Sequence, residues 1–434
     1  MDKIQTLKGF RDFLPAEAKK RQYVINTLES VFESYGFDPL ETPALEYEEV
    51  LIGKYGEEGD KLMYRFADNG GRRVALRYDQ TVPLARVVAQ YANVLPFPFK
   101  RYQIQPVWRA ENTQKGRFRE FLQCDVDTVG TDSLAADAEI VAVVAKSYEA
   151  LGFTDYKIII NDRKVFKDIP LKAIIIIDKL KKIGEEKVKQ ELKEKGFDPE
   201  MLGWIQSAEQ PDTIKMIVDI AEGMGVNRNK IVFEPTLARG LDYYTGMIFE
   251  VEIGGYTVGS VGGGGRYDNL IGMFARSAGH STLRDGSSGL RLNSDPERTR
   301  TGSDSKSSGQ AGRDIPAVGF AFGFDRIMDA MGEKDMLKDK GSSAKVLVTI
   351  FGLEFADDSM EVSSQLRAKN ITTELWLDAN VKMEKQLKYA NEKGIPYVII
   401  IGPEEKEKGV VTVRDMKTRE QKQVPLGNLP DALK

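Results

Sequence analysis

The sequence predicts an α+β protein, in which an antiparallel-sheet domain carries a helical insertion and is followed by a small α/β domain. Alternating apolar runs such as RRVALRYD and FKRYQIQPVWRAE indicate antiparallel strands up to about residue 130, and strands resume near residue 230. Between them, 163–228 is charged and predicted to be helical. The last ninety or so residues alternate strands with helices, as βαβ units do. We therefore expect one domain in two parts, 1–162 and 229–335, the insertion 163–228, and a second domain, 344–434.

The first part of the sheet domain begins with a predicted helix. Apolar residues at helical spacing indicate this helix over 16–35, and Gly36 ends it. Pro43 breaks any continuing helix, and antiparallel strands are expected from there to about residue 130. A second helix is predicted over 133–151, and a strand in YKIIIND follows it.

The remaining elements follow from the same patterns. The stretch IIIIDKLKKIGEEKVKQELKEKGF is charged and helical, which marks the insertion. Strands resume with KIVFEPTLARGLDYYTGMIFEVEIGGYTVGSVGGGGRYD, and two further apolar segments, NLIGMFA and IPAVGFAFGFDRIM, are expected to be β. In the C-terminal domain, strands are predicted in KVLVTIF, ITTELWL, PYVIIIG and VVTVRDM.

Residues 276–312 fit none of these elements. They contain no aromatic residue and almost no aliphatic ones, and about half are Gly, Ser or Thr. Such a composition cannot bury enough apolar surface to offset the entropy of ordering. We expect a disordered insertion without a catalytic role, in which His280 is idle.

Composition excludes several classes of protein. The formal net charge is −4, so RNA could be held only by local basic patches and shape. A single cysteine, Cys124, suits the reducing cytoplasm, and neither a signal peptide nor a membrane span is expected. Because His280 is the only histidine, a Ser-His-Asp or Cys-His nucleophile arrangement is excluded and a resident metal site is not expected. The chemistry must depend on arginines, carboxylates and a reactive substrate.

The segment PVWRAENTQKGRFREFLQCDVDTVG, 106–130, is predicted to be a hairpin with cations around its loop. Its guanidinium groups could bind a polyphosphate, and Phe121 could stack on a base. The alternative is a solvated hairpin tip, which is the usual role of a charged run. Arg109 argues against that alternative, because it follows Trp108 in an apolar strand where an unpaired charge would be costly.

Three other segments carry weaker signals. In LRYDQTVPLAR, Asp79 and Thr81 lie two apart on a stretch taken as extended, so they could hold an ammonium group, although a turn or helix cap is the commoner role. The glycines of SVGGGGRYDNL would admit a ligand or another strand, or form a flexible turn. In AVGFAFGFDRIM a strand runs into a helix, where Arg326 could reach a phosphate or form a surface ion pair.

A fourth segment, LARGLDYYTGMIFEV (237–251), has the apolar pattern of a strand but an unusual first half. Arg239, Gly240 and Asp242 are followed there by two tyrosines and a second glycine. A buried strand does not need a guanidinium, a carboxylate and two phenols so close together. We expect this half to form the wall of a pocket.

Together these segments resemble class II aminoacyl-tRNA synthetases, and specifically the histidyl-tRNA synthetase family, over nearly the whole chain apart from 276–312. FDPLETPALE, with Pro43, is similar to motif 1, the dimer-interface element, VWRAENTQKGRFREF to motif 2, and AVGFAFGFDRI to motif 3. LARGLDYYTG and VGGGGRYDNL are similar to the signatures specific for histidine. LRYDQTVP and QCDVD look like the archaeal and eukaryotic style of the family.

The resemblance implies a role for each matching residue. Arg109 and Arg239 would be catalytic, both against the α-phosphate of ATP. The implied ATP-binding residues are Arg109, Glu111, Arg117, Phe121 and Arg326. The implied histidine-binding residues are Asp79, Thr81, Gln123, Asp127, Arg239, Tyr243 and Tyr244, with Asp127 and Tyr244 on the imidazole. The implied tRNA contacts are Gln114, Lys115 and Arg119.

The resemblance also implies the reaction and its partners. L-histidine would be activated by ATP with Mg²⁺ and ligated to tRNA(His), in a cytoplasmic homodimer formed through motif 1. The sheet domain would be the class II catalytic domain, and 344–434 the anticodon-binding domain. One alternative is the inactive paralogue that serves as regulatory subunit of ATP phosphoribosyltransferase. It generally lacks the C-terminal domain and degrades the RGLDYY signature, and both are intact here. Another is a prolyl- or threonyl-type class II enzyme, which lacks RGLDYYTG.

Overall fold

The computed structural model describes most of the chain in six ranges, 4–54, 56–113, 116–238, 243–278, 314–337 and 341–433. Its contacts divide the chain into two compact units. One comprises 1–12 and 21–336, and the other comprises 13–20 and 337–434. Within the described ranges, no helix has the length and apolar character needed to cross a bilayer.

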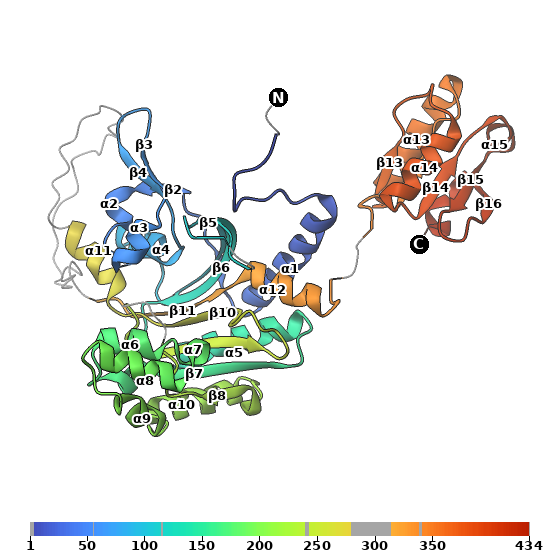
Figure 1. The fold of residues 1–434 in the computed structure, drawn as a ribbon. Helices are drawn as coiled ribbons and strands as arrows, with labels where there is room; N and C mark the ends of the chain where they lie inside the picture. Colours follow the sequence, from blue (N-terminus) through green and yellow to red (C-terminus); the bar gives the residue numbers. More distant parts are fainter. Residues whose placement is uncertain are drawn as a thin grey trace, which may run out of the picture. The chain divides into compact units, whose positions relative to one another are not determined.

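The first unit is built on an eight-stranded sheet with the order β1-β5-β6-β11-β10-β9-β7-β8 (Figure 1). Only the outermost pairs, β1 with β5 and β7 with β8, are parallel, so the predicted antiparallel sheet is confirmed. The strands are β1 (Asp38–Pro39), β5 (Phe99–Trp108), β6 (Glu120–Val129), β7 (Tyr156–Asp162), β8 (Ile231–Phe233), β9 (Met247–Ile253), β10 (Gly262–Arg266) and β11 (Ala317–Phe322).

Helices α1 (Pro15–Ser34) and α5 (Leu134–Ala150) cover one face of this sheet. The ring centroid of Phe32 on α1 lies 5.6 Å from that of Phe322 on β11, and the ring centroid of Tyr148 on α5 lies 5.8 Å from that of Phe322. The start of α5 is capped, because Ser133 accepts a hydrogen bond from the backbone N–H of Ala135. Both helices match their predicted positions. Their packing leaves the opposite face of the sheet for other groups.

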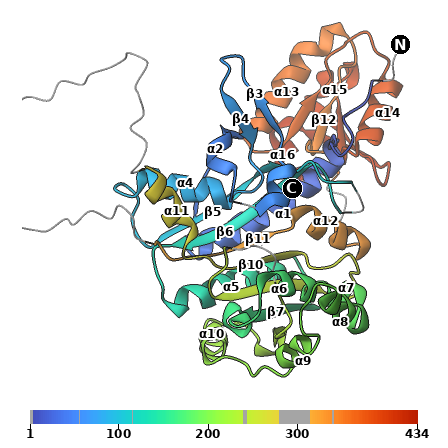
Figure 2. The ribbon, with the colours of Figure 1, turned by 60° about the vertical axis from the view of Figure 1, so that its left-hand side comes forward.

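The first unit also contains three helices next to its central strands and a small sheet with two short helices beside it. Helices α4 (Thr81–Tyr91) and α11 (Leu270–Ala278) pack side by side, and α12 (Phe324–Glu333) follows β11 directly (Figures 1 and 2). The small antiparallel sheet has the order β2-β4-β3. Its strands and the two short helices beside it are β2 (Leu45–Tyr47), β3 (Arg65–Ala67), β4 (Arg73–Leu76), α2 (Glu48–Leu51) and α3 (Gly56–Lys61).

The segment between β7 and β8 is helical, as its sequence predicts (Figure 2). Its apolar side chains, among them Ile174, Ile177 and Leu192, join the core of the first unit. The boundaries proposed for it as a separate module stay a prediction. Its helices are α6 (Leu171–Ile177), α7 (Leu180–Ile183), α8 (Glu185–Glu194), α9 (Met201–Gln206) and α10 (Asp212–Gly223).

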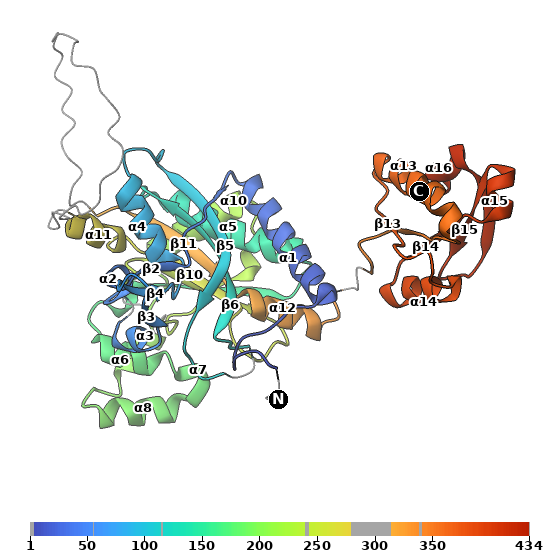
Figure 3. The same ribbon diagram turned by 90° about the horizontal axis from the view of Figure 1, so that it is seen from above.

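The second unit is a five-stranded sheet with the order β13-β12-β14-β15-β16. The βαβ prediction is confirmed, because β12 pairs in parallel with both β13 and β14, while β15 and β16 add an antiparallel edge. Figure 3 shows α13 and α16 on one side of this sheet and α14 on the other, in agreement with two separate apolar clusters. The elements are β12 (Val346–Val348), α13 (Ala356–Ala368), β13 (Thr373–Leu375), α14 (Met383–Lys393), β14 (Tyr397–Ile400), α15 (Pro403–Lys408), β15 (Val410–Asp415), β16 (Gln421–Pro425) and α16 (Leu429–Ala432).

Three local predictions are wrong, and one open alternative is decided. NLIGMFA is not β but the start of α11, which also includes 276–278; the rest of the predicted insert, with His280, lies outside the described residues. The stretch taken as extended around Thr81 is the beginning of α4, where the Asp79 carboxylate accepts a hydrogen bond from the backbone N–H of Val82. The predicted strand 237–251 begins only at Met247. The glycine run forms strand β10, so of its two readings the close approach to another strand is confirmed and the flexible turn is not.

Glycine is required in β10 because the neighbouring backbones approach too closely for side chains. A Cβ on Gly264 would lie 2.0 Å from the carbonyl oxygen of Gly319, and one on Gly265 would lie 2.4 Å from that of Met247. No rotamer change can relieve a clash with backbone. Glycine is also needed on β11, where a Cβ on Gly319 would lie 1.8 Å from the side-chain oxygen Asp127 Oδ1.

Replacing Gly264 with alanine is therefore expected to push β10 away from β11 and to lower the free energy of unfolding by about 1–3 kcal/mol or more. Urea unfolding followed by circular dichroism measures this loss. The matched control is Gly332→Ala in α12, where nothing lies within 4 Å of the new Cβ. There alanine is expected to stabilise by about 0.5–1 kcal/mol. Equal effects at both positions would contradict the explanation.

Candidate active site

The uncovered face of the central strands is polar. Gln123, Asp125 and Asp127 alternate along β6, so their side chains point to the same side. The intervening Cys124 and Val126 are fully buried on the other side and pair with Phe322 and Tyr102 in the layer beneath α1 and α5. One strand therefore supplies core on one face and a row of polar groups on the other.

This row lines a cavity of 340 Å³, which we call the acidic cavity because Asp79, Asp125 and Asp127 all border it. Six of the residues predicted to bind histidine line it together: Asp79, Thr81, Gln123, Asp127, Tyr243 and Tyr244. The wrong local structure predicted for Thr81 did not remove it from the site, because the first turn of α4 faces the same space.

Asp127 is held at one end of the acidic cavity by two partners. Its Oδ2 lies 2.8 Å from Arg101 Nη2, and both side chains are almost wholly buried. The phenol of Tyr267 donates a hydrogen bond to Oδ1. Burial raises the pKa of Asp127, while the Arg101 guanidinium lowers it. Neither Arg101 nor Tyr267 was predicted to be a site residue. The role of Arg101 can be inferred only from the strand register that places it opposite Asp127.

The tyrosine wall of the cavity is fixed by hydrogen bonds to the end of β10. The rings of Tyr243 and Tyr244 lie 4.9 Å apart. Just after them, Thr245 donates from its backbone N–H to the carbonyl of Arg266 and from its hydroxyl to Asp268. Arg266 in turn forms a buried ion pair with Asp137 near the start of α5.

A second cavity, of 290 Å³, adjoins the first; we call it the basic cavity because Arg109, Arg117 and Arg326 line it. All five residues predicted to bind ATP border it, since Glu111 and Phe121 lie there too. Arg117 pairs with Glu111 at 3.4 Å and is 45% exposed, whereas Arg326 donates to the carbonyl of Ser260 at 2.7 Å. The phosphate-binding role of Arg326 stays a prediction.

Arg109 stands where the two cavities meet, because it and Gln123 line both. Its Nε donates to the carbonyl oxygen of Tyr78 at 3.1 Å, and its Nη2 donates to Gln123 Oε1 at 3.3 Å. The guanidinium also lies over the rings of Tyr78 and Phe121, 4.4 and 5.1 Å from their centroids. These contacts fix a positive charge at the junction before any ligand arrives.

Several predicted residues are not part of this geometry. Arg239, Gln114 and Lys115 lie outside the described residues. Arg119 is described but does not line either cavity. Its Nε donates to the carbonyl oxygen of Glu111 at 3.1 Å, so it supports the loop rather than the cavity.

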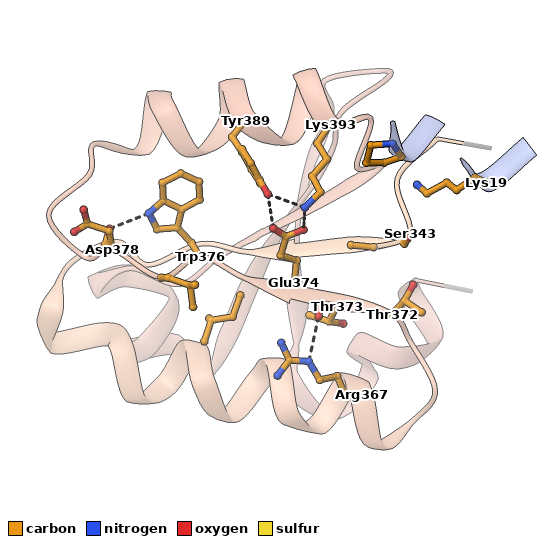
Figure 4. Close-up of a pocket in the computed structure, with 14 residues that line it drawn as sticks. Lys19, Ser343, Arg367, Thr372, Thr373, Glu374, Trp376, Asp378, Tyr389 and Lys393 are labelled. Carbon is orange, nitrogen blue, oxygen red and sulfur yellow. Dashed lines mark hydrogen bonds and ion pairs between the residues drawn. The ribbon is translucent and has the colours of Figure 1, made fainter. Parts of the chain in front are cut away.

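The second unit has a pocket of its own, drawn in Figure 4. Glu374 on β13 accepts hydrogen bonds from Tyr389 and from Lys393, both on α14. The Trp376 ring meets Tyr389 edge to face at 5.3 Å, and its Nε1 donates to the carbonyl oxygen of Asp378. An aromatic surface beside a lysine suits a nucleobase and a phosphate.

Two protein-family models match the chain, one lying mainly in the first compact unit and the other in the second. The model for "Histidyl-tRNA synthetase" matches residues 9–199 and 199–282, and the model for "Anticodon binding domain" matches 345–434. The chain is 38% identical to the histidine–tRNA ligase of Cytophaga hutchinsonii over 97% of both chains.

Solved structures give the same picture. The crystal structure of histidyl-tRNA synthetase from Nostoc sp. superposes with a TM-score of 0.80 at 29% identity, covering 100% of this chain and 99% of the other. An ATP phosphoribosyltransferase regulatory subunit/histidyl-tRNA synthetase from Bacillus halodurans has a TM-score of 0.68 at 20% identity, over 90% of this chain and 97% of that one, and shows the fold alone.

Proposed function

Because the chain belongs to the histidyl-tRNA synthetase family, we propose that its two joined cavities activate L-histidine with ATP and ligate it to tRNA(His). The observation that carries this proposal is the position of Arg109, which borders a cavity lined by carboxylates on one side and a cavity lined by arginines on the other. An amino acid and a nucleotide placed in these cavities would meet at its guanidinium.

In the proposed first step, a carboxylate oxygen of histidine bonds to the α-phosphorus of ATP. The bond from that phosphorus to the bridging oxygen breaks, and pyrophosphate leaves. Two anions must approach each other for this step, so fixed positive charge supplies the catalysis without an acid–base residue. Arg109 provides that charge at the α-phosphate, and Arg239 is proposed to join it. In the second step a terminal ribose hydroxyl of the tRNA attacks the acyl carbon, and AMP leaves.

The remaining residues are proposed to bind and orient the two substrates. Asp127 and Tyr244 face the imidazole, and Asp79, Thr81 and Gln123 face the α-ammonium group. Glu111 and Phe121 would hold the adenine, the latter by stacking, while Arg117 and Arg326 would hold the outer phosphates. Among the described residues, no group of three or more His, Cys, Asp or Glu side chains could hold a metal. We therefore assign Mg²⁺ to the phosphates of the incoming ATP.

The tRNA is proposed to contact both units of the chain. Gln114, Lys115 and Arg119 on the loop between β5 and β6 would meet the acceptor end, and the pocket beside Trp376 in the second unit would meet the anticodon. A homodimer through the segment around Pro43 and a cytoplasmic location complete the proposal. The regulatory-paralogue alternative is not favoured, because 345–434 matches an anticodon-binding domain and histidine–tRNA ligases align along nearly the whole chain.

The test is amino-acid-dependent exchange of labelled pyrophosphate into ATP, measured with each of the twenty amino acids. We expect exchange with histidine alone, followed by charging of tRNA(His). Exchange with proline or threonine instead would assign the chain to another class II specificity. No exchange with any amino acid, together with retained histidine binding, would support the regulatory alternative.

A further inference from the structure

Asp125 is a buried carboxylate of the acidic cavity to which the roles above give no part. Asp125 is only 1% exposed to solvent. Its Oδ2 accepts a hydrogen bond of 2.9 Å from Gln123 Nε2, whereas its Oδ1 has no hydrogen-bond partner among the described residues. Leaving such an atom unsatisfied costs about 1–3 kcal/mol, so a buried oxygen without a partner beside a cavity indicates a ligand.

The position of Asp125 identifies the part of the ligand that would reach it. Asp125 lies midway between Gln123 and Asp127 on β6, about 7 Å from each along the strand. Gln123, which is proposed to face the α-ammonium group, also borders the basic cavity, and the substrate carboxylate must lie towards that cavity to meet the α-phosphate. Asp127 stands at the other end, where the imidazole is placed. The α-ammonium group, on the carbon between these two ends, falls beside Asp125.

We propose that Asp125 binds the substrate, its Oδ1 accepting a hydrogen bond from the α-ammonium group of histidine, and that it releases a proton to solvent when histidine binds. The inference rests on the proposed function and adds a residue to its amino-acid site. Asp79 is proposed to face the same ammonium group, but its Oδ1 already accepts from the N–H of Val82, and Asp127 is held by Arg101 and Tyr267.

The groups around Asp125 explain why it holds a proton before histidine binds. Burial raises the pKa of Asp125 to about 8; the Arg101 guanidinium on β5 lowers it, and Asp127 and Asp79 raise it. The Tyr267 phenol and the Arg109 guanidinium also border the cavity, while the paired residue on β11 is Ala321, which carries no charge. At pH 7 the free protein therefore holds a neutral Asp125 next to the Arg101–Asp127 pair.

An ammonium group beside Asp125 lowers its pKa, so the proton leaves on binding. Because the bound state holds fewer protons, histidine affinity must rise with pH below the pKa of the free protein and level off above about pH 8.

The experiment is isothermal titration calorimetry of the full chain with L-histidine, in two buffers of different ionisation enthalpy, for wild type and Asp125→Asn. Asparagine keeps the shape of the neutral carboxyl but cannot ionise. At pH 7 we expect wild type to release about 0.9 proton more than the variant. The ratio of their affinities should grow about tenfold between pH 6 and pH 7, since the ligand's own ionisation cancels in the ratio.

Thr128→Val is the matched control, because Thr128 lies on the same strand but points to the opposite face. It is expected to leave proton release and histidine affinity unchanged. Equal proton release from wild type and Asp125→Asn would overturn the proposal, even where histidine-dependent pyrophosphate exchange supports the function. If Asp125→Asn does not fold, wild type alone decides: binding at pH 7 without proton release overturns the proposal, and release of about one proton supports it.

Discussion

Replacing Arg109 with glutamine is expected to lower the rate of histidine-dependent pyrophosphate exchange by about 10²- to 10³-fold, the usual effect of removing one preorganised group that faces developing charge. Arg109 is the described arginine that borders both cavities. Its guanidinium is already oriented by Tyr78 and Gln123, so little reorganisation is needed when the substrates meet.

Two further variants separate charge from geometry. Arg109→Lys keeps the charge but cannot bond Tyr78 and Gln123 together in the same plane, so we expect most of the loss to remain. Arg72→Gln is the control: this arginine lies between β3 and β4, is 64% exposed, pairs with Asp68 and lines neither cavity. A lysine variant with wild-type exchange would show that charge alone suffices, and full activity in Arg109→Gln would exclude the proposed role.

The long elements of the fold were predictable because local pattern and tertiary burial agree in them. The sides of α1 and α5 that meet the sheet carry their apolar residues at helical spacing, and β6 and β9 alternate polar with apolar residues, as strands with two different faces should. Where the two signals conflict, prediction failed. NLIGMFA is apolar enough for a strand, yet it forms α11 and packs along α4. Periodicity over so few residues cannot distinguish the two.

The glycine strand was left open and the tyrosine turn was mispredicted, both for a different reason. Gly262–Arg266 has no side-chain pattern to indicate a strand, and only the close approach of β9 and β11 reveals why it is one. The segment before Met247 looked extended because its apolar residues continue those of β9, but Tyr243 and Tyr244 leave the sheet and form a cavity wall. Tertiary contacts decide both structures.

Most residues of the site were identified through motifs, whereas their partners were not. Nothing in the sequence marks Arg101, the single arginine of β5, as the partner of a buried carboxylate, because its role depends on the β5–β6 register. Asp125 could have been found, because its position two residues from both Gln123 and Asp127 puts it on the same face of a strand. The sequence thus identifies groups that line the cavities more readily than the groups that hold them in place.

A large loss of folding stability is expected when Asp125 and Asp127 are both replaced. Asp125 and Asp127 share a single buried cation, Arg101, and repel each other, and the pKa of Asp125, raised to about 8, keeps Asp125 neutral at pH 7. In Asp127→Asn the repulsion disappears, the pKa of Asp125 falls, and Asp125 ionises to balance Arg101. We therefore expect a moderate loss of stability, about 1–2 kcal/mol, together with weaker histidine binding.

In the double variant Asp125→Asn/Asp127→Asn no carboxylate remains to balance Arg101, and a buried charge without a partner costs about 3–5 kcal/mol. The double loss should therefore exceed the sum of the two single losses, because Asp125→Asn alone removes only a neutral group. Urea unfolding of the four proteins in a double-mutant cycle measures the difference. Adding Arg101→Met to the double variant should recover much of the stability, since an apolar side chain needs no counter-charge. Additive single losses, or no recovery with methionine, would show that the two carboxylates do not share one charge.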